Sequence, residues 1–416
     1  MSGSPSALRF LNDRAALEAL LQHEAITRAQ LEALVGLSKP ATAQLLSRLE
    51  KAGLVERLGR REVGPGPRAQ LWGLKADAGF AAGVDVTRQG IDVEIADLRG
   101  NTVAQHLAPA PAGTTSSAAT APGPTPGSGP GPTPGSGPGP TPGSGPGAAL
   151  GAALAEACAQ AGISVDRLAH VAIGTPGSVD AVSGRLRYAS DVPAWTNVNV
   201  LQAIGAVLDV PFTIENDVNL VALNEMARGS AQDVRDFVLL WISERSVGSS
   251  VVVHGGLVRG ATLGAGELGF TPVPDLAREP LPGVHRFGDL LANSALLTLA
   301  GSHGLQAVGA VDAVRQSLGR DGGFLTDLAR RIAAGLAAVV SILDPELIVL
   351  GGAVCSTGGP ALRAAISDAL AEFVEPRVRI LPGRPDSDSV RAGAVQAALV
   401  HAREHYFSAG SSLGDS

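Results

Sequence analysis

Three short polar motifs follow one another along the chain: Gly-Thr-Pro-Gly at residues 174–177, Ile-Glu-Asn-Asp-Val-Asn at 214–219 and Gly-Glu-Leu-Gly-Phe at 266–270. A carboxylate accepts hydrogen bonds from hydroxyl groups, and a well-placed one can take the proton from an attacking hydroxyl. Asp217 and Glu267 are the candidates for this chemistry. Each also has a plain structural interpretation, because Asp is a preferred N-cap of a following helix and Glu267 could be an ordinary surface-loop acid.

The segments around these motifs alternate between strand and helix patterns. Apolar runs at 168–173 and 211–214 lead into the first two motifs, and residues 217–228 have helical spacing. Strands alternating with helices are typical of an α/β domain. The other elements expected are strands at 81–86, 91–97, 102–107, 237–242, 251–254 and 346–350, and helices at 148–161 and 325–342.

A separate module precedes this body, with three short helices predicted at 13–22, 28–35 and 39–52. Thr27 followed by Gln30 forms a capping box that begins the second helix. Ser38 is expected to cap the third helix, and Gly53 to end it in a left-handed conformation. The apolar faces expected for the first two helices consist of Leu17, Leu20 and Leu21, and of Leu31, Leu34 and Val35.

The third helix has an apolar side and a polar side. Such a polar stripe is what a recognition helix presents to the DNA major groove, where Gln44 could pair with adenine and Arg48 with guanine or a phosphate. Taken alone, the stripe could equally be a solvated helix face. The candidate DNA-binding residues on this helix are Lys39, Ala43, Gln44, Ser47 and Arg48, with Lys51 on the same side.

The next segment favours DNA binding. Residues 54–58 and 69–74 read as two strands joined by a turn, which predicts a wing. Arg60, Arg61 and Arg68 lie on this turn, where they could contact the DNA backbone beside the groove. A helix-turn-helix followed by an arginine-bearing wing predicts a module that binds double-stranded DNA.

Charge separates the two parts of the chain. The formal net charge is −7 overall, but residues 1–75 contain eleven Lys and Arg and seven Asp and Glu, giving +4 and leaving −11 for the rest. A basic module on an acidic body is expected when only one end meets phosphate. The two cysteines suggest neither a disulfide framework nor a zinc cluster. No signal peptide or membrane span is recognisable, so we expect a cytoplasmic protein.

A low-complexity segment interrupts the body. Residues 122–145 are three copies of Pro-Gly-Pro-Thr-Pro-Gly-Ser-Gly, inside a region rich in Ala, Pro, Thr and Ser at 108–147. This composition cannot bury a core. We therefore expect a disordered insertion within the domain rather than a boundary between domains.

Four short sequence segments resemble the ROK family, which comprises repressors, open reading frames and kinases. They lie at residues 190–198, 215–219, 255–260 and 344–352. The resemblance covers residues 80–404 apart from the insertion, and residues 1–75 resemble the N-terminal domain of ROK repressors. It implies an α/β protein with an N-terminal winged helix-turn-helix at 1–75, a two-lobed actin-like ATPase (ROK or hexokinase-like) domain at 80–404 and a flexible tail at 405–416.

The resemblance also implies roles for individual residues. In ROK kinases the Asp of the Asn-Asp pair is the catalytic base, which corresponds to Asp217. Asn216 would bind a neighbouring sugar hydroxyl, the peptide at Gly177 would line the site, and Glu267 would bind further hydroxyls. These four residues are the candidate ligand-binding set.

The chain departs from the family at the phosphate loops and the zinc site. The family glycines that approach ATP phosphates are replaced at residues 85–89 (Asp-Val-Thr-Arg-Gln) and 244–246 (Glu-Arg-Ser). Phe270 stands where the family has a zinc-binding His, and residues 271–291 contain no cysteine and only His285. Zinc prefers four Cys or His ligands. We therefore expect no metal, no cofactor and no catalysis.

The sequence thus predicts a transcriptional repressor controlled by a sugar, sugar derivative or sugar phosphate bound in a non-catalytic ROK domain. Reading two operator half-sites requires a homodimer or a tetramer. Two alternatives stay open. One is an ATP-dependent sugar kinase with divergent phosphate loops, and the other is a regulator whose ROK domain serves only dimerisation.

Overall fold

The chain divides into two compact units. One comprises Met1–Pro176, Gly184–Ile214 and Ala394–Ser416, and the other Gly177–Ser183 and Glu215–Gly393. The computed structural model describes residues 5–61, 68–110, 145–180, 182–187, 192–196, 198–273, 286–320, 323–375, 378–384 and 389–409. The repeat at 122–145 lies almost entirely outside them.

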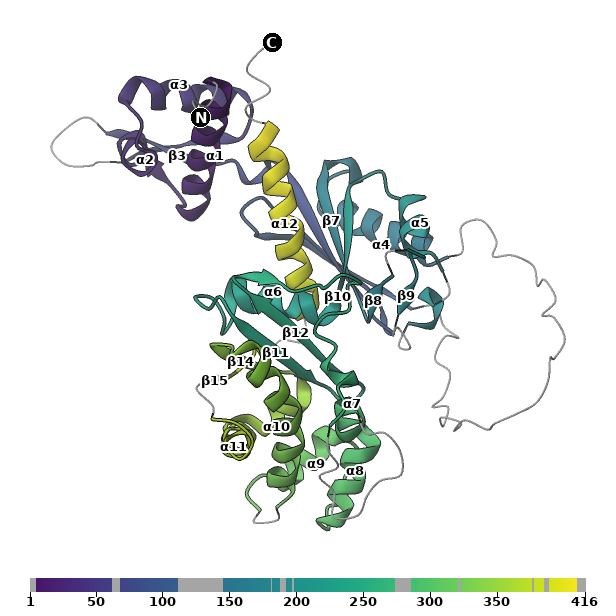
Figure 1. Ribbon diagram of the computed structural model, residues 1–416. Coiled ribbons are helices and arrows are strands. Elements are labelled where there is room, and N and C mark those ends of the chain that lie inside the picture. Colours follow the sequence, from purple (N-terminus) through teal and green to yellow (C-terminus); the bar gives the residue numbers. More distant parts are fainter. Residues whose placement is uncertain are drawn as a thin grey trace. The chain divides into compact units, whose positions relative to one another are not determined.

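The N-terminal module is a winged helix (Figure 1). Its three-stranded sheet has the order β1-β3-β2, with both pairings antiparallel. The predicted capping box is confirmed: the Thr27 N–H donates to Gln30 Oε1 at 2.8 Å, and the Gln30 N–H donates to Thr27 Oγ1 at 3.2 Å. The elements are α1 (Pro5–Gln22), β1 (Ile26–Thr27), α2 (Arg28–Val35), α3 (Lys39–Lys51), β2 (Val55–Arg61) and β3 (Ala69–Leu74).

Three details of the module differ from the prediction. Helix α1 begins at Pro5, eight residues before the predicted start. Leu34 of α2, expected in the core, is 55% exposed, because this short helix buries only Leu31. Leu46 of α3 is buried. Ser38 makes no side-chain capping bond, and its carbonyl instead accepts a hydrogen bond from Thr42 Oγ1 at 3.2 Å.

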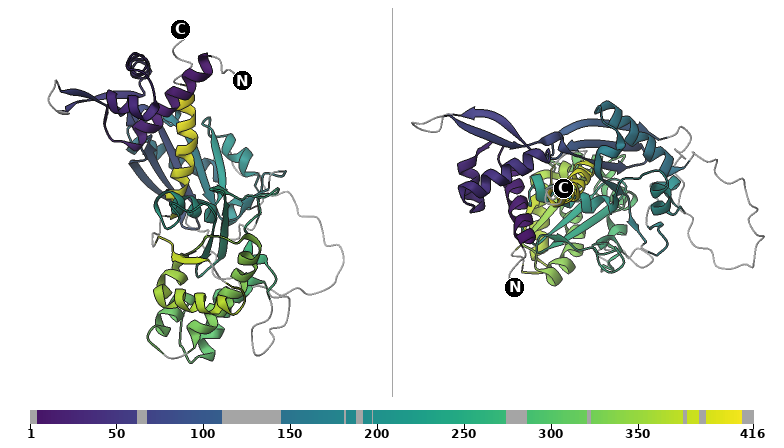
Figure 2. Two further views of the ribbon diagram at one scale, coloured as in Figure 1. Left: turned by 60° about the vertical axis from the view of Figure 1, so that its left-hand side comes forward. Right: turned by 90° about the horizontal axis from the view of Figure 1, so that it is seen from above.

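The first of two mixed α/β sheets has the order β10-β7-β4-β5-β6. Strand β4 is antiparallel to β5 and parallel to β7. Helix α4 packs on β5 and β6, and α12 runs along the sheet in Figure 2. A Cβ atom at Gly83 of β4 would collide with the Val395 backbone of α12, so this close approach requires glycine. The elements are β4 (Phe80–Val86), β5 (Gly90–Asp97), β6 (Thr102–Pro109), α4 (Pro146–Gln160), β7 (Leu168–Thr175), β9 (Leu186–Arg187), α5 (Val200–Gly205), β10 (Phe212–Asn216) and α12 (Ser389–Ala409).

The second sheet has the order β13-β12-β11-β14-β15, with β11 parallel to β14 and antiparallel to β12. Successive side chains of a strand point to opposite faces. Accordingly Leu240 and Ile348 pack with the large helical cluster, whereas Leu239 and Val349 pack with α6. The elements are β8 (Ser178–Val179), α6 (Asp217–Arg228), β11 (Phe237–Ile242), β12 (Val247–Val253), β13 (Gly256–Leu257), α7 (Phe287–Leu291), α8 (Asn293–Ser302), α9 (Ala310–Ser317), α10 (Phe324–Leu343), β14 (Leu347–Gly351), α11 (Gly352–Ala371) and β15 (Arg379–Pro382).

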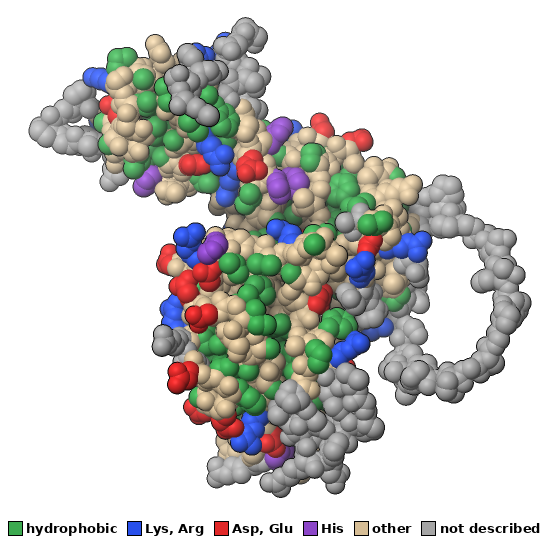
Figure 3. Space-filling model, viewed as in Figure 1, with side chains coloured by type: hydrophobic (Ala, Val, Ile, Leu, Met, Phe, Trp, Pro, Cys, Tyr) green, Lys and Arg blue, Asp and Glu red, His purple; other side chains and the backbone are tan. Residues whose placement is uncertain are grey.

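Charged side chains are visible on the surface of the second unit. Figure 3 shows Asp and Glu side chains gathered along the left margin of the second unit. Among the described residues, no helix combines the length and apolar content needed to cross a bilayer. Helix α12 continues to Ala409, so residues 405–409 are helical where a flexible tail was expected.

Candidate functional site

Helix α3, the candidate recognition helix, has a buried side and an exposed side. Thr42, Leu45, Leu46 and Leu49 are buried. The other side of the helix carries the candidate DNA-binding groups. Lys39, Gln44, Ser47 and Lys51 are exposed, whereas Ala43 and Arg48 are half-buried.

Arg48 has a partner that the sequence did not indicate. Its Nε lies 3.1 Å from Asp13 Oδ2, and its Nη2 binds Asp13 Oδ1. The Asp13 side chain is completely buried, and that of Arg48 is 23% exposed. The pair joins α1 to α3, so Arg48 has a structural contact that does not depend on DNA.

The wing strand β2 places Arg60 in solvent, and Arg68 is exposed just before β3. The backbone of Arg61 ends β2, but its side chain lies outside the described residues. Within the described part of the module, Lys39, Lys51 and Arg60 have no side-chain hydrogen bond or ion pair. Arg57, in contrast, lies 2.9 Å from Glu50 and stacks over Trp72.

In the second unit, Asn216 organises the first part of the candidate ligand site. Its Oδ1 accepts hydrogen bonds from the N–H groups of Val218 (2.9 Å) and Asn219 (3.3 Å), and its Nδ2 donates to the Gly177 carbonyl (3.2 Å). Asn216, not Asp217, is therefore the N-cap of α6. Asp217 is the first residue of the helix, where its Oδ1 accepts from the Val218 N–H at 2.8 Å. The structure thus brings Gly177, Asn216 and Asp217 together.

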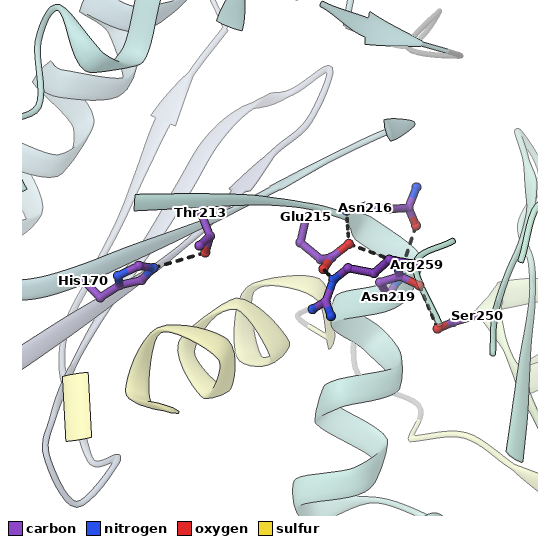
Figure 4. A network of polar contacts seen from close by, with 7 residues as sticks. All are labelled: His170, Thr213, Glu215, Asn216, Asn219, Ser250 and Arg259. Carbon is purple, nitrogen blue, oxygen red and sulfur yellow. Dashed lines mark hydrogen bonds and ion pairs between the residues drawn. The ribbon is translucent and has the colours of Figure 1, made fainter. Parts of the chain in front are cut away.

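A polar network supports this helix start (Figure 4). Glu215 accepts a hydrogen bond from Asn219 Nδ2 at 2.8 Å and pairs with Arg259 Nε at 2.7 Å. Asn219 Oδ1 accepts from Ser250 Oγ at 2.8 Å, and both side chains are buried. Glu215 and Asn219 belong to the motif recognised in the sequence, but nothing local indicated that Ser250 and Arg259 would join them.

Glu267 lies in a neighbouring turn held by Ser249 of β12. The Ser249 hydroxyl donates to the Gly266 carbonyl and accepts from the Leu268 N–H at 3.3 Å. Burial raises the pKa of the Glu267 carboxyl above its usual range. Within the described residues, no hydrogen bond joins the Glu267 side chain to Asn216 or Asp217. The connection runs through the consecutive residues Ser249 and Ser250.

The two loops that correspond to the family's phosphate loops are closed by their own side chains. In the hairpin at 85–89, Thr87 Oγ1 accepts the Gln89 N–H at 3.2 Å. In the β11–β12 turn, Ser243 Oγ accepts the N–H groups of Arg245 (3.2 Å) and Ser246 (3.0 Å). The N–H groups of Gln89, Arg245 and Ser246 are therefore engaged within their own loops.

Glu244 adds a negative charge beside the second loop. Its Oε1 accepts the Val311 N–H at 3.4 Å, at the start of α9. A carboxylate at a helix N-terminus interacts favourably with the helix dipole. The same charge would repel the phosphates of a nucleotide.

The donor set near Glu267 does not suit zinc. Phe270 offers an aromatic ring, and Arg286 places a guanidinium carbon 5.2 Å from the centroid of that ring. The two cysteines of the chain, Cys158 and Cys355, are buried elsewhere, and burial raises their thiol pKa values to about 11 and about 12. Neither thiol is available as a ligand at this position.

Comparisons with known proteins cover both parts of the chain. Residues 138–402 match the ROK family, and residues 12–64 match the MarR family. A beta-glucoside kinase of Listeria monocytogenes is 28% identical over 200 residues, which are 45% of this chain and only 65% of the kinase. A putative xylose repressor of Caldicellulosiruptor sp. is 23% identical over 367 residues, which are 84% of each protein.

A solved structure matches nearly the whole chain. The structure of a ROK family transcriptional regulator, a homologue of the E. coli MLC protein, aligns with a TM-score of 0.68 at 16% identity. The alignment covers 97% of this chain and 99% of that regulator. At this identity the match establishes the fold, and it includes the winged helix as well as both sheets.

Proposed function

Because the chain belongs to the ROK family and carries a winged helix ahead of its ROK domain, we propose that it is a DNA-binding transcriptional repressor whose ROK domain binds a sugar or sugar derivative without phosphorylating it. The observation that carries this proposal is the exposed face of α3. There Gln44 and Ser47 are free to meet base edges, and Lys39 and Lys51 have no partner within the described residues. The corresponding domains are residues 1–75 for DNA binding and 80–404 for sensing.

The proposed effector site consists of Gly177, Asn216, Asp217 and Glu267. Asp217 supplies a carboxylate at the start of α6, and Glu267 supplies a second one on the turn beside β12. Carboxylates and peptide groups together can accept and donate the hydrogen bonds of a sugar hydroxyl. The putative xylose repressor among the relatives supports a sugar as the effector class.

The absence of catalysis is proposed from the two loops. Thr87 and Ser243 engage the loop N–H groups, and Glu244 adds an anion beside the second loop. Phosphoryl transfer depends on positioning the phosphates and neutralising their charge. Loops with these contacts do neither.

Regulation requires that the effector binds two states of the protein with different affinity. A homodimer or tetramer would present two winged helices to half-sites about 34–36 Å apart, which is one turn of DNA. The effector would change their spacing and release the operator.

The proposal is tested with the purified full-length protein in two parts. A random duplex library is first selected for binding, and the selected DNA is titrated in the presence of single sugars. In parallel, thermal unfolding is followed with sugars, amino sugars, sugar phosphates and ATP, since a ligand at about one hundred times its Kd adds roughly 2.7 kcal/mol of stability.

We expect selective DNA binding, a thermal shift with one sugar class and weaker DNA binding in its presence. A shift with ATP together with phosphorylation of the sugar would establish a kinase instead. Selective DNA binding without any sugar-dependent shift would support the dimerisation-only alternative.

A further inference from the structure

The Glu267 turn is fixed at both ends. On one side, Ser249 binds the residues that flank Glu267. On the other side, the chain forms the short helical turn η4 (Leu268–Phe270), in which the Phe270 N–H donates to the Glu267 carbonyl at 3.1 Å and the Thr271 N–H donates to the Leu268 carbonyl at 2.9 Å. Whatever holds Phe270 and Thr271 therefore also holds the backbone of Glu267.

Three contacts attach this turn to the start of α7. Pro272 forms an antiparallel bridge with Arg286, and the Phe287 N–H donates to the Thr271 carbonyl at 2.9 Å. The Arg286 guanidinium lies over the Phe270 ring. Phe287, the next residue, is completely buried in the helical core of the second unit. The turn is thus attached to the core through residues 286 and 287.

The two backbones also approach closely. A Cβ atom at Gly288 of α7 would lie 3.0 Å from the Gly269 carbonyl oxygen. That distance is too short for an ordinary contact, so a side chain at residue 288 would push the turn away. The backbone of the turn at Gly269 is therefore in close contact with the backbone of α7 at Gly288.

This region is where the family resemblance places a structural zinc, and the residues present contradict it. A closed zinc site needs four Cys or His ligands. Residues 271–291 offer only His285 in their sequence, Phe270 has no donor atom, and the Arg286 guanidinium over the Phe270 ring is cationic and cannot act as a ligand.

We propose that Arg286, stacked on Phe270, is a metal-free clamp that positions Glu267, and that Arg286 therefore acts as a positioning residue of the effector site. The proposal rests on the proposed function only in taking Glu267 as a ligand-binding group. The clamp, the Pro272–Arg286 bridge and the Phe287 N–H together join residues 270–272 to residues 286 and 287.

The experiment compares Arg286→Gln with the wild-type full-length protein by hydrogen exchange of the backbone amides of Leu268, Phe270 and Thr271. Gln keeps the length of the side chain and the backbone bridge but removes the cation. We expect exchange of these amides to rise roughly two- to fivefold, the factor expected for loss of a cation–π contact at an exposed site. Arg286→Lys should restore most of the protection.

Two controls separate a local effect from a general one. Arg315→Gln removes another exposed arginine of the second unit, paired with Asp312 at 3.6 Å on α9, and should leave the three amides unchanged. A zinc chelator should change neither the exchange nor the melting temperature of the wild type, and elemental analysis should find less than stoichiometric zinc. Unchanged exchange in Arg286→Gln, or stoichiometric zinc with a chelator effect, overturns the proposal.

Failure of the clamp and failure of the proposed function give different results, because amide exchange needs no effector. If no sugar shifts the melting temperature while Arg286→Gln still loosens the turn, the clamp stands and sugar sensing fails. If a sugar binds, Arg286→Gln should lower its affinity without changing DNA binding in the absence of sugar.

Discussion

Removing Arg48 is expected to destabilise the winged helix by about 3 kcal/mol. The substitution Arg48→Ala leaves the fully buried carboxylate of Asp13 without its partner. Breaking a buried ion pair from one side typically costs about 3–5 kcal/mol, because the remaining charge is uncompensated. The lower end applies here, since Arg48 is 23% exposed and water can reach part of the pair. Asp13→Asn should cost less, because the remaining guanidinium can turn toward solvent.

The unfolding free energy of the module can be measured with urea, using the fluorescence of Trp72 in β3 after Trp195 and Trp241 are replaced by Phe. Arg14→Ala is the matched control, because Arg14 pairs with Glu18 on α1 at 2.8 Å and both side chains are about half exposed, at 45% and 50%. An exposed pair of this kind contributes less than about 1 kcal/mol. Equal unfolding midpoints for Arg48→Ala and Arg14→Ala would refute the structural role.

The same variants distinguish whether Arg48 only holds α3 in place or also contacts DNA. Arg48→Ala is also expected to weaken operator binding by at least about 1 kcal/mol. If Arg48 also contacts a phosphate, the slope of log K against log salt should become less steep by about 0.9. If it only holds α3 in place, affinity falls with an unchanged slope, and Asp13→Asn weakens binding in the same way. Unchanged titrations for both variants would remove this pair from the DNA-binding argument.

Three further predictions concern the body of the protein. Asp217→Asn should abolish the response to effector in thermal-shift assays while DNA binding stays intact, whereas loss of DNA binding would indicate a structural role. Burial, assisted by the nearby His401, lowers the pKa of His170 from 6.5 to about 4. The unfolded chain therefore binds more protons than the folded chain in this pH range. As the pH is lowered from 6.5 to 4, the free energy of unfolding should fall by at most about 3 kcal/mol. In His170→Gln this pH dependence should flatten, and an unchanged profile would contradict the assignment. Glu244→Ala should destabilise the second unit by about 1 kcal/mol through loss of its contact at α9, and an unchanged urea midpoint would show that this contact contributes nothing.

Elements specified by neighbouring residues were predictable from the sequence. Helix α2 occupies the predicted residues because Thr27 and Gln30 cap it and Gly36 ends it with a φ of 72°. Helix α6 and strand β11 also match the predicted ranges. In each case the signal is local, namely a cap, a short apolar run or a helical period.

The contacts that define the sites were less predictable, because their partners are distant in the sequence. Asp13 and Arg48 are 35 residues apart, and Glu215 and Arg259 are 44 apart. Asp13 looks like any polar residue of a surface helix, but in the folded module it is buried and paired with Arg48 of α3. The core-packed helices α11 and α12 were not assigned from the sequence, since their many alanines and glycines give a weak periodic pattern.

The two consecutive serines of β12 have a thermodynamic consequence. Ser249 holds the turn of Glu267 and Ser250 holds Asn219 at the start of α6, so a single peptide unit joins two groups that share no direct hydrogen bond within the described residues. Substitutions of contacting or network-sharing residues are not additive. A double-mutant cycle between Ser249→Ala and Asn219→Ala should therefore yield a non-zero interaction energy. A ligand that contacts only one of the two site carboxylates, Asp217 or Glu267, should also reduce the fluctuations of the other carboxylate.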